Sequence, residues 1–83
     1  MKDLLKDYES YLKIERAMSR NTVASYASDV GRFLEAVPCA PELMTPEDVE
    51  TYLQSRSSIS KRSQARLLSS IRSFFSWLVI EGV

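Results

Sequence analysis

The sequence predicts an all-α fold, a compact bundle of four helices joined by short loops. Apolar residues recur at three- and four-residue spacing in four separate segments, which is the pattern of helices with one buried face. A Ser or Thr suited to an N-cap precedes each of the last three segments, and no segment alternates as a strand does. We therefore expect a single domain over residues 1–83, as is usual for a chain of this length.

Two helices are expected in the first half of the chain. The first is predicted over residues 2–16, and the second extends from its N-cap at Ser19 to residue 37. Pro38 is expected to end the second helix, because proline has no N–H to donate within a helix. Residues 38–43 hold two prolines within four positions and are predicted to form a loop without helix.

Two further helices are expected in the second half. A helix is predicted over residues 46–56, because Thr45 suits the N-cap, Pro46 follows it at the first helical position, and Asp48 stands at the third. The fourth helix is the longest pattern, and it extends from the N-cap Ser60 to Gly82, which suits the left-handed residue after a helix. Its predicted buried face consists of Leu67, Leu68, Ile71, Phe74, Phe75 and Leu78.

The net charge of the chain is zero, but the charge is unevenly distributed. Residues 1–55 carry six basic and ten acidic side chains, whereas residues 56–80 carry five basic side chains and no acidic one. Surface helices ordinarily mix both signs, because opposite charges four residues apart stabilise a helix. The last third of the chain is therefore suited to contact with a polyanion.

Missing residue types argue against several classes of function. The chain has no histidine, and its single cysteine, Cys39, is expected to be a small buried apolar residue. The two glycines, Gly31 and Gly82, cannot form a phosphate-binding loop. We expect no enzyme activity, cofactor or metal in this chain, and we expect its four tyrosines to pack in the core. The lone cysteine and the lack of an 18-residue apolar run or a signal peptide favour a cytoplasmic location.

Two helix faces are candidates for binding, because each repeats small polar and basic residues at helical spacing. They hold Asn21, Ser25, Ser28 and Arg32 on the second helix, and Arg62, Arg66, Ser69 and Ser73, with Arg72 beside them, on the fourth. The second of these faces is about 16 Å long, against ~12 Å for the width of a DNA major groove. The alternative is that both faces are ordinary solvated surface.

Free N–H groups at the start of each of these two helices can also bind phosphates. With them, the predicted set of contact residues is Arg20, Asn21, Thr22, Ser25, Ser28, Arg32, Lys61, Arg62, Ser63, Arg66, Ser69, Arg72 and Ser73.

Two stretches resemble the N-terminal core-binding domain of tyrosine recombinases, the family of phage integrases and Xer-type enzymes. In residues 19–34, SRNTVASYASDVGRFL, the family pattern is matched by Ser19, Thr22, Val23, Tyr26, Asp29, Val30 and Phe33. In residues 63–78, SQARLLSSIRSFFSWL, it is matched by Arg66, Leu68, Ser69, Ile71, Arg72 and Phe74. With MTPEDV between them, the resemblance covers nearly the whole chain.

The resemblance implies a SAM-like, orthogonal four-helix domain whose second and fourth helices lie against the major groove of a recombination half-site. It implies double-stranded DNA and a C-terminal catalytic domain as partners, in a protein that assembles as a homo- or hetero-tetramer on DNA. That catalytic domain is absent from these 83 residues, which are expected to be monomeric, and no catalytic residue transfers to them. The second helix departs from the expectation by its weak basicity, with only Arg20 and Arg32.

An alternative function is a helical protein–protein interaction module without DNA binding. Trp77 and Ile80 favour it, because both are expected on the outer side of the fourth helix, where an exposed apolar pair marks an interface. Within the recombinase interpretation, the same pair would contact the catalytic domain or a neighbouring subunit.

Overall fold

The computed structural model describes residues 4–37 and 40–82, and its helices follow the predicted order. They are α1 (Leu4–Ile14), α2 (Arg20–Ala36), a short 3-10 helix η1 (Pro41–Leu43), α3 (Pro46–Ser55) and α4 (Lys61–Glu81). No strand occurs within the described ranges. The prediction of an all-α, compact orthogonal four-helix bundle is confirmed.

Local capping explains where the helices begin and end. The side chains of Ser19 and Ser60 accept hydrogen bonds from backbone N–H groups three residues on, each at 3.2 Å. At α3 the capping box is complete, since the Thr45 N–H donates to Asp48 Oδ2 at 2.9 Å and the Asp48 N–H donates to Thr45 Oγ1. Gly82 ends α4 with a left-handed φ of 74°, as expected from its place in the sequence.

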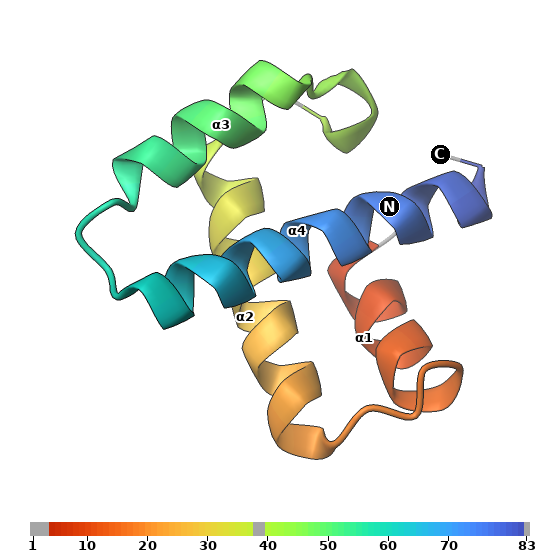
Figure 1. Cartoon of the computed structure of the whole chain (residues 1–83). Helices are drawn as coiled ribbons and strands as arrows, with labels where there is room; N and C mark the ends of the chain where they lie inside the picture. The colour runs from red at the N-terminus through yellow and green to blue at the C-terminus, as the bar shows by residue number, and fades with distance from the viewer. Residues whose placement is uncertain (1–3, 38–39, 83) are drawn as a thin grey trace.

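The helices enclose two contiguous apolar clusters. Figure 1 shows α4 crossing α2, with α1 beside α2 and α3 on the other side of α4. The first cluster joins α1, α2 and α4 and contains Tyr8, Leu12, Val23, Val30, Phe74, Trp77 and Leu78. The second joins α2, α3 and α4 and contains Phe33, Val37, Tyr52, Leu67 and Ile71. Because α4 contributes to both clusters, its sides are buried and only one narrow strip of it faces outward.

Two predictions differ from the structure by more than one residue. Residues 41–43 form a 3-10 turn instead of a plain loop, because a proline can occupy the first helical position, where no N–H is needed. The N–H groups of Leu43 and Met44 close this turn on Ala40 and Pro41. The first helix ends at Ile14 and not at residue 16, since the chain reverses at Ala17 with a φ of 48°. The expectations for Pro38 and Cys39 fall outside the described residues.

The prediction that Trp77 is an exposed interface residue is wrong. Its side chain is 1% exposed and lies against Tyr8, at 5.6 Å between ring centroids, and against Phe74, at 5.9 Å. The physical reason is that α1 covers this side of α4, so the buried face of α4 is wider than its strongest apolar stripe. Ile80 does lie on the surface, at 67% exposure.

A polar cluster holds α2 and α4 together at their crossing. Arg66 donates from Nε to Asp29 Oδ2 at 2.9 Å and from a terminal nitrogen to Asp29 Oδ1 at 3.1 Å. The Ser70 hydroxyl lies 3.1 Å from Asp29 Oδ2. Asp29 is only 6% exposed, whereas the Arg66 side chain remains 47% exposed. The ion pair therefore neutralises a buried carboxylate with an arginine that still reaches the surface.

We expect Arg66→Ala to destabilise the fold by about 1–3 kcal/mol, because it leaves the buried Asp29 carboxylate without its cation. A second variant, Asp29→Ala with Arg66→Ala, should recover part of this loss, since no uncompensated charge remains buried. Urea unfolding measures both. Arg62→Ala, on the exposed face of the same helix, should stay within roughly 0.5 kcal/mol. Equal losses for the Arg66 and Arg62 variants would show that the Asp29 pair contributes nothing.

Tyr8 should make the stability of the fold sensitive to alkaline pH. Its ring is fully buried, and this burial raises the pKa of Tyr8 above its ordinary value of 10.0. Because the pKa is raised on folding, Tyr8 contributes its full stabilisation at a pH below its pKa in the unfolded chain. This stabilisation is lost as the pH rises through the pKa of Tyr8 in the folded chain. The free energy of unfolding should therefore fall above about pH 10, and it should fall less steeply in Tyr8→Phe. If the free energy of unfolding falls equally with pH in the wild type and in Tyr8→Phe, ionisation of Tyr8 is not the cause of the alkaline loss of stability.

Candidate nucleic-acid interface

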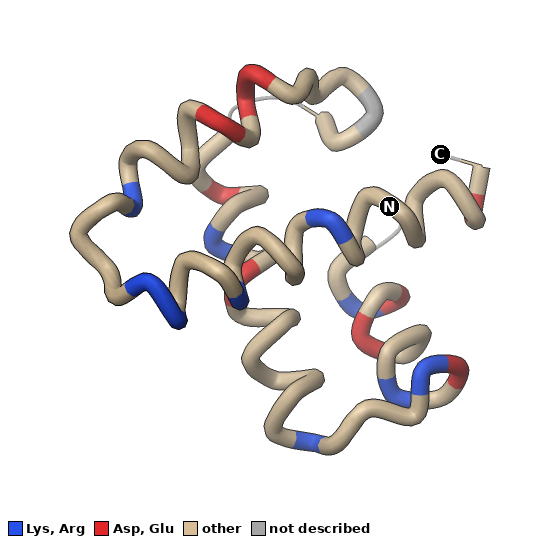
Figure 2. Tube along the Cα trace, in the orientation of Figure 1, with Lys and Arg blue, Asp and Glu red and all other residues tan. Residues whose placement is uncertain are grey.

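Most of the predicted contact residues lie on the surface. The exposed members are Arg20, Asn21, Ser28 and Arg32 on α2, and Lys61, Arg62, Arg66, Ser69 and Arg72 on α4. Figure 2 shows basic residues along the N-terminal half and middle of α4, with acidic residues only at its far end. The start of α3, by contrast, is acidic. Positive charge thus gathers on α4, and negative charge gathers at the start of α3.

The register of the outer face of α4 differs from the prediction by a small rotation. Ser73 was expected on this face, but its hydroxyl oxygen is buried beside the Tyr8 side chain of α1. The exposed line instead passes through Arg62, Ala65, Ser69, Arg72 and Ser76. Contact with α1 explains the rotation, because Tyr8 of that helix lies against Ser73 and donates to the carbonyl oxygen of the buried Ser70.

The polar residues of α2 divide into an exposed line and a half-buried one. Thr22 and Ser25 are half-buried, and the Thr22 hydroxyl lies 2.8 Å from the Ser19 hydroxyl at the helix N-cap. Asn21 and Ser28 are exposed, and Ala24 lies between them on the same line. Small residues on this line leave the helix backbone open to close approach by another surface.

The N-terminus of α4 gathers several donors. Lys61 and Arg62 are exposed in its first turn, where the N–H groups of a helix carry partial positive charge. Ser63 is half-buried, and its oxygen accepts a hydrogen bond from the Ser60 hydroxyl at 3.1 Å. No carboxylate lies in this turn.

Arg66 has a structural role that the sequence analysis did not assign. The ion pair with Asp29 occupies two of its five N–H donors, so three remain available on a side chain that is about half-exposed. The carboxylate raises the pKa of Arg66 above its already high ordinary value, so the guanidinium stays charged at every working pH. Arg66 therefore joins α2 to α4 and can also donate outward.

Arg56 is a further basic residue of this region that sequence reasoning missed as a site residue. It follows α3, is half-buried, and lines a hollow of about 130 Å³ together with Arg32 and Arg66. Its Nε is buried without a hydrogen-bond partner in the described part of the chain. The only signal in the sequence was its membership of the stretch without acidic residues.

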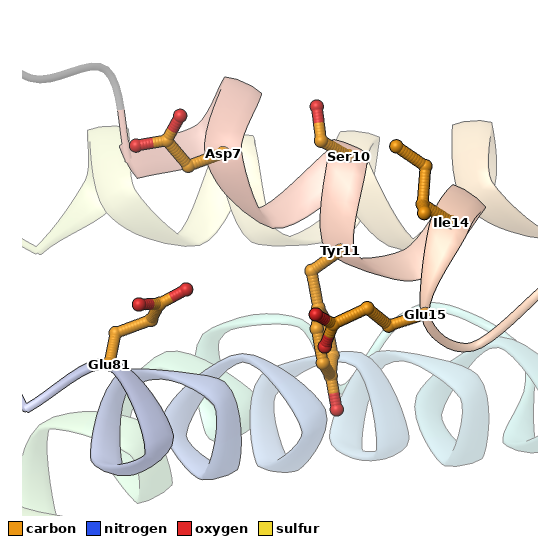
Figure 3. A pocket seen from close by; sticks show the side chains of 6 residues that line it. All are labelled: Asp7, Ser10, Tyr11, Ile14, Glu15 and Glu81. Atoms are coloured by element: carbon orange, nitrogen blue, oxygen red, sulfur yellow. The ribbon is translucent and has the colours of Figure 1, made fainter.

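A second hollow, away from the start of α4, has an acidic lining. A hollow of about 350 Å³ between α1 and the end of α4 is lined by Asp7, Glu15 and Glu81, with Tyr11 on its wall. Figure 3 shows Asp7 and Glu81 on facing helices. Three carboxylates make this end unsuited to a polyanion.

The residues that the structure describes offer neither a metal site nor a membrane span. No group of three or more His, Cys, Asp or Glu side chains among them is placed to hold a metal ion. None of the described helices is both long and apolar enough to span a membrane.

Comparison with known proteins agrees with this architecture. The family described as "Phage integrase, N-terminal SAM-like domain" matches residues 5–82. The chain is 33% identical over 89 aligned residues to tyrosine recombinase XerD of Listeria monocytogenes, covering 99% of this chain and 30% of that protein. It is 35% identical to tyrosine recombinase XerC of Leptospira interrogans, an alignment that covers 100% of this chain and 29% of that protein. It is 38% identical to tyrosine recombinase XerD of Chlorobaculum tepidum, over 93% of this chain and 27% of that protein.

The chain therefore spans less than a third of the length of these relatives. No solved structure matches it significantly. The match over nearly all of its residues and the observed four-helix fold lead to one assignment. The chain belongs to the phage integrase family of tyrosine recombinases, as its N-terminal SAM-like domain.

Proposed function

We propose that this chain is a DNA-binding domain of a site-specific tyrosine recombinase and that it clamps a recombination half-site through α2 and α4. The observation that carries the proposal is the exposed strip of α4, which presents Lys61, Arg62, Arg66 and Arg72 with no carboxylate until Glu81. Duplex DNA is the polyanion that recombinases act on, and its binding depends chiefly on neutralising phosphates with such side chains.

The crossing of α2 and α4 supports contact by both helices at once. Asp29 and Arg66 join the two helices by paired hydrogen bonds, and Ser28 and Arg32 lie exposed on either side of Asp29 in the sequence. Serine and arginine can each donate to phosphates or to base edges. The acidic hollow at Asp7, Glu15 and Glu81 faces a different end of the bundle, so the field of the domain would orient it on DNA.

Catalysis would belong to another domain of the whole protein. The relatives are named tyrosine recombinases and are more than three times as long as this chain, so a C-terminal catalytic domain is the natural partner. On DNA the full protein would act as a homo- or hetero-tetramer, during integration or recombination. The exposed Val79 and Ile80 at the end of α4 are the apolar residues best placed for a protein partner.

A protein–protein module without DNA binding is the second candidate. Its support is an open apolar groove of about 580 Å³ between α3 and α4, which includes Val49, Leu68, Phe75 and Val79. The same groove is compatible with the recombinase assignment, because a catalytic domain or neighbouring subunit is also a protein. Duplex binding separates the two candidates.

We expect the 83-residue chain to bind duplex DNA weakly, with a Kd of about 10⁻⁴–10⁻⁶ M, and with an affinity that falls steeply with salt. A labelled duplex titrated between roughly 50 and 200 mM salt gives the slope of log K against log salt. Arg72→Gln should reduce the magnitude of this slope by about 1, the loss of one phosphate contact.

The matched control for this measurement is Arg16→Gln, which removes the same charge from an exposed residue two positions beyond the end of α1 and outside α2 and α4. It should leave the slope unchanged. Salt-independent binding, no binding at low salt, or an equal effect of the two variants would contradict the proposed function.

We also expect the chain to bind DNA without cutting it. It contains no histidine, and its four tyrosines are buried or half-buried: Tyr8, Tyr11, Tyr26 and Tyr52. A buried phenol without a base is not activated as a nucleophile. Incubation with a nicked suicide duplex, followed by denaturing electrophoresis, should show no covalent adduct. An adduct mapped to any of the four tyrosines would overturn the division between binding and catalysis.

A further inference from the structure

The hollow at the junction of α2, α3 and α4 has an excess of positive charge. Its wall includes Arg32 from α2, Arg56 from the end of α3 and Arg66 from α4, with Asp29 as the one carboxylate. Asp29 is already bonded to Arg66 by two hydrogen bonds. Two guanidinium groups, those of Arg32 and Arg56, therefore remain without a carboxylate partner among the described residues.

Arg56 carries the argument further. Its Nε is buried and has no acceptor in the described chain, although the rest of the side chain is only half-buried. A buried donor without an acceptor is costly, and a buried guanidinium N–H is especially so. An anionic acceptor would satisfy this N–H and would also balance the charge of the site, and a planar guanidinium binds the oxygens of such a group in pairs.

The size of the hollow fits one small oxyanion. Its volume is about 130 Å³. This corresponds to roughly four water-sized positions, which is the number of oxygens in a phosphate group. The buried side chains of Tyr52 and Leu67 form part of the wall, and apolar walls strengthen the attraction between the arginines and an anion. Ser63, in the first turn of α4, adds a hydroxyl at the rim.

We propose that this hollow is a binding pocket for a single phosphate group, held by Arg32 and Arg56 and oriented by the Arg66–Asp29 pair. The neighbouring exposed strip of α4, with Lys61, Arg62 and Arg72, favours a backbone phosphate of bound duplex DNA as the phosphate in this pocket. This identification of the phosphate rests on the proposed function. Bound there, one phosphate would link the end of α3 to the two helices that flank it. The pocket would thus set the position of the domain along the DNA backbone.

The first test uses inorganic phosphate on the 83-residue chain, at constant ionic strength kept with chloride. Phosphate raised to about 100 mM should increase the unfolding midpoint by about 4 °C or more, because a ligand of the native state stabilises it by mass action. Arg56→Gln should abolish the increase, and Arg16→Gln should retain it. If Arg56→Gln does not fold, Arg32→Gln on the exposed rim should weaken the response instead. No increase in the wild type, or an equal one in the folded pocket variant, would overturn the pocket.

The second test identifies the source of the phosphate. If the pocket takes a backbone phosphate, Arg56→Gln should reduce the salt slope of duplex binding by about 1. An unchanged slope, with the phosphate response still lost, would assign the pocket to a free phosphate ligand. Arg62→Gln should lower the slope but keep the response to inorganic phosphate, since this residue lies outside the hollow. A wild-type chain that responds to phosphate yet binds no duplex would refute the proposed function and leave the pocket intact.

Discussion

The Asp29–Arg66 ion pair is the interaction on which the arrangement of this domain depends. Apolar contacts between α2 and α4 favour close packing, but they have little directional preference and would allow several crossing angles. The paired hydrogen bonds of a guanidinium and a carboxylate have a fixed planar geometry, and Ser70 adds a third contact to the same carboxylate. Since Asp29 is almost fully buried, no water can replace this cation cheaply. Two helices of the proposed interface are thereby held in one mutual orientation.

A net charge of zero is compatible with a polyanion as partner because the charge is segregated. The basic strip of α4 and the hollow at Arg56 occupy one region, and the carboxylates of Asp7, Glu15 and Glu81 occupy another. Such a molecule has no net attraction to a polyanion, but one of its faces is locally basic, so a partner of negative charge is favoured on that face. This arrangement gives selectivity of approach at the expense of affinity, which suits a domain that acts as part of a larger protein.

Features that depend on neighbouring residues were predictable from the sequence. The N-caps at Ser19, Thr45 and Ser60 and the glycine after α4 were all found where local chemistry placed them. The family and the four-helix fold also followed from short patterns. The 3-10 turn was missed because two prolines suggest a break in helix more strongly than a turn that begins with one.

Features that depend on packing between distant helices were not predictable. Asp29 and Arg66 lie 37 positions apart, and nothing in either local pattern indicates that they meet. The side of α4 covered by α1 decides that Trp77 and Ser73 face inward, and this depends on the crossing angle of the helices and not on the periodicity of α4. Arg56 was unremarkable in the sequence because its neighbours in the hollow come from two other helices.

The burial of Trp77 has a consequence for observing this molecule in solution. It is the only tryptophan in the chain, and its indole lies between α1 and α4, in contact with two tyrosine rings. The exposed strip of α4 is on another side of the same helix. Indole fluorescence therefore reports the docking of α1, while a polyanion on the basic strip lies too far away to stack on the ring. A spectral change on adding a partner would signal a change in the packing or field around the buried indole, and not stacking of the partner on it.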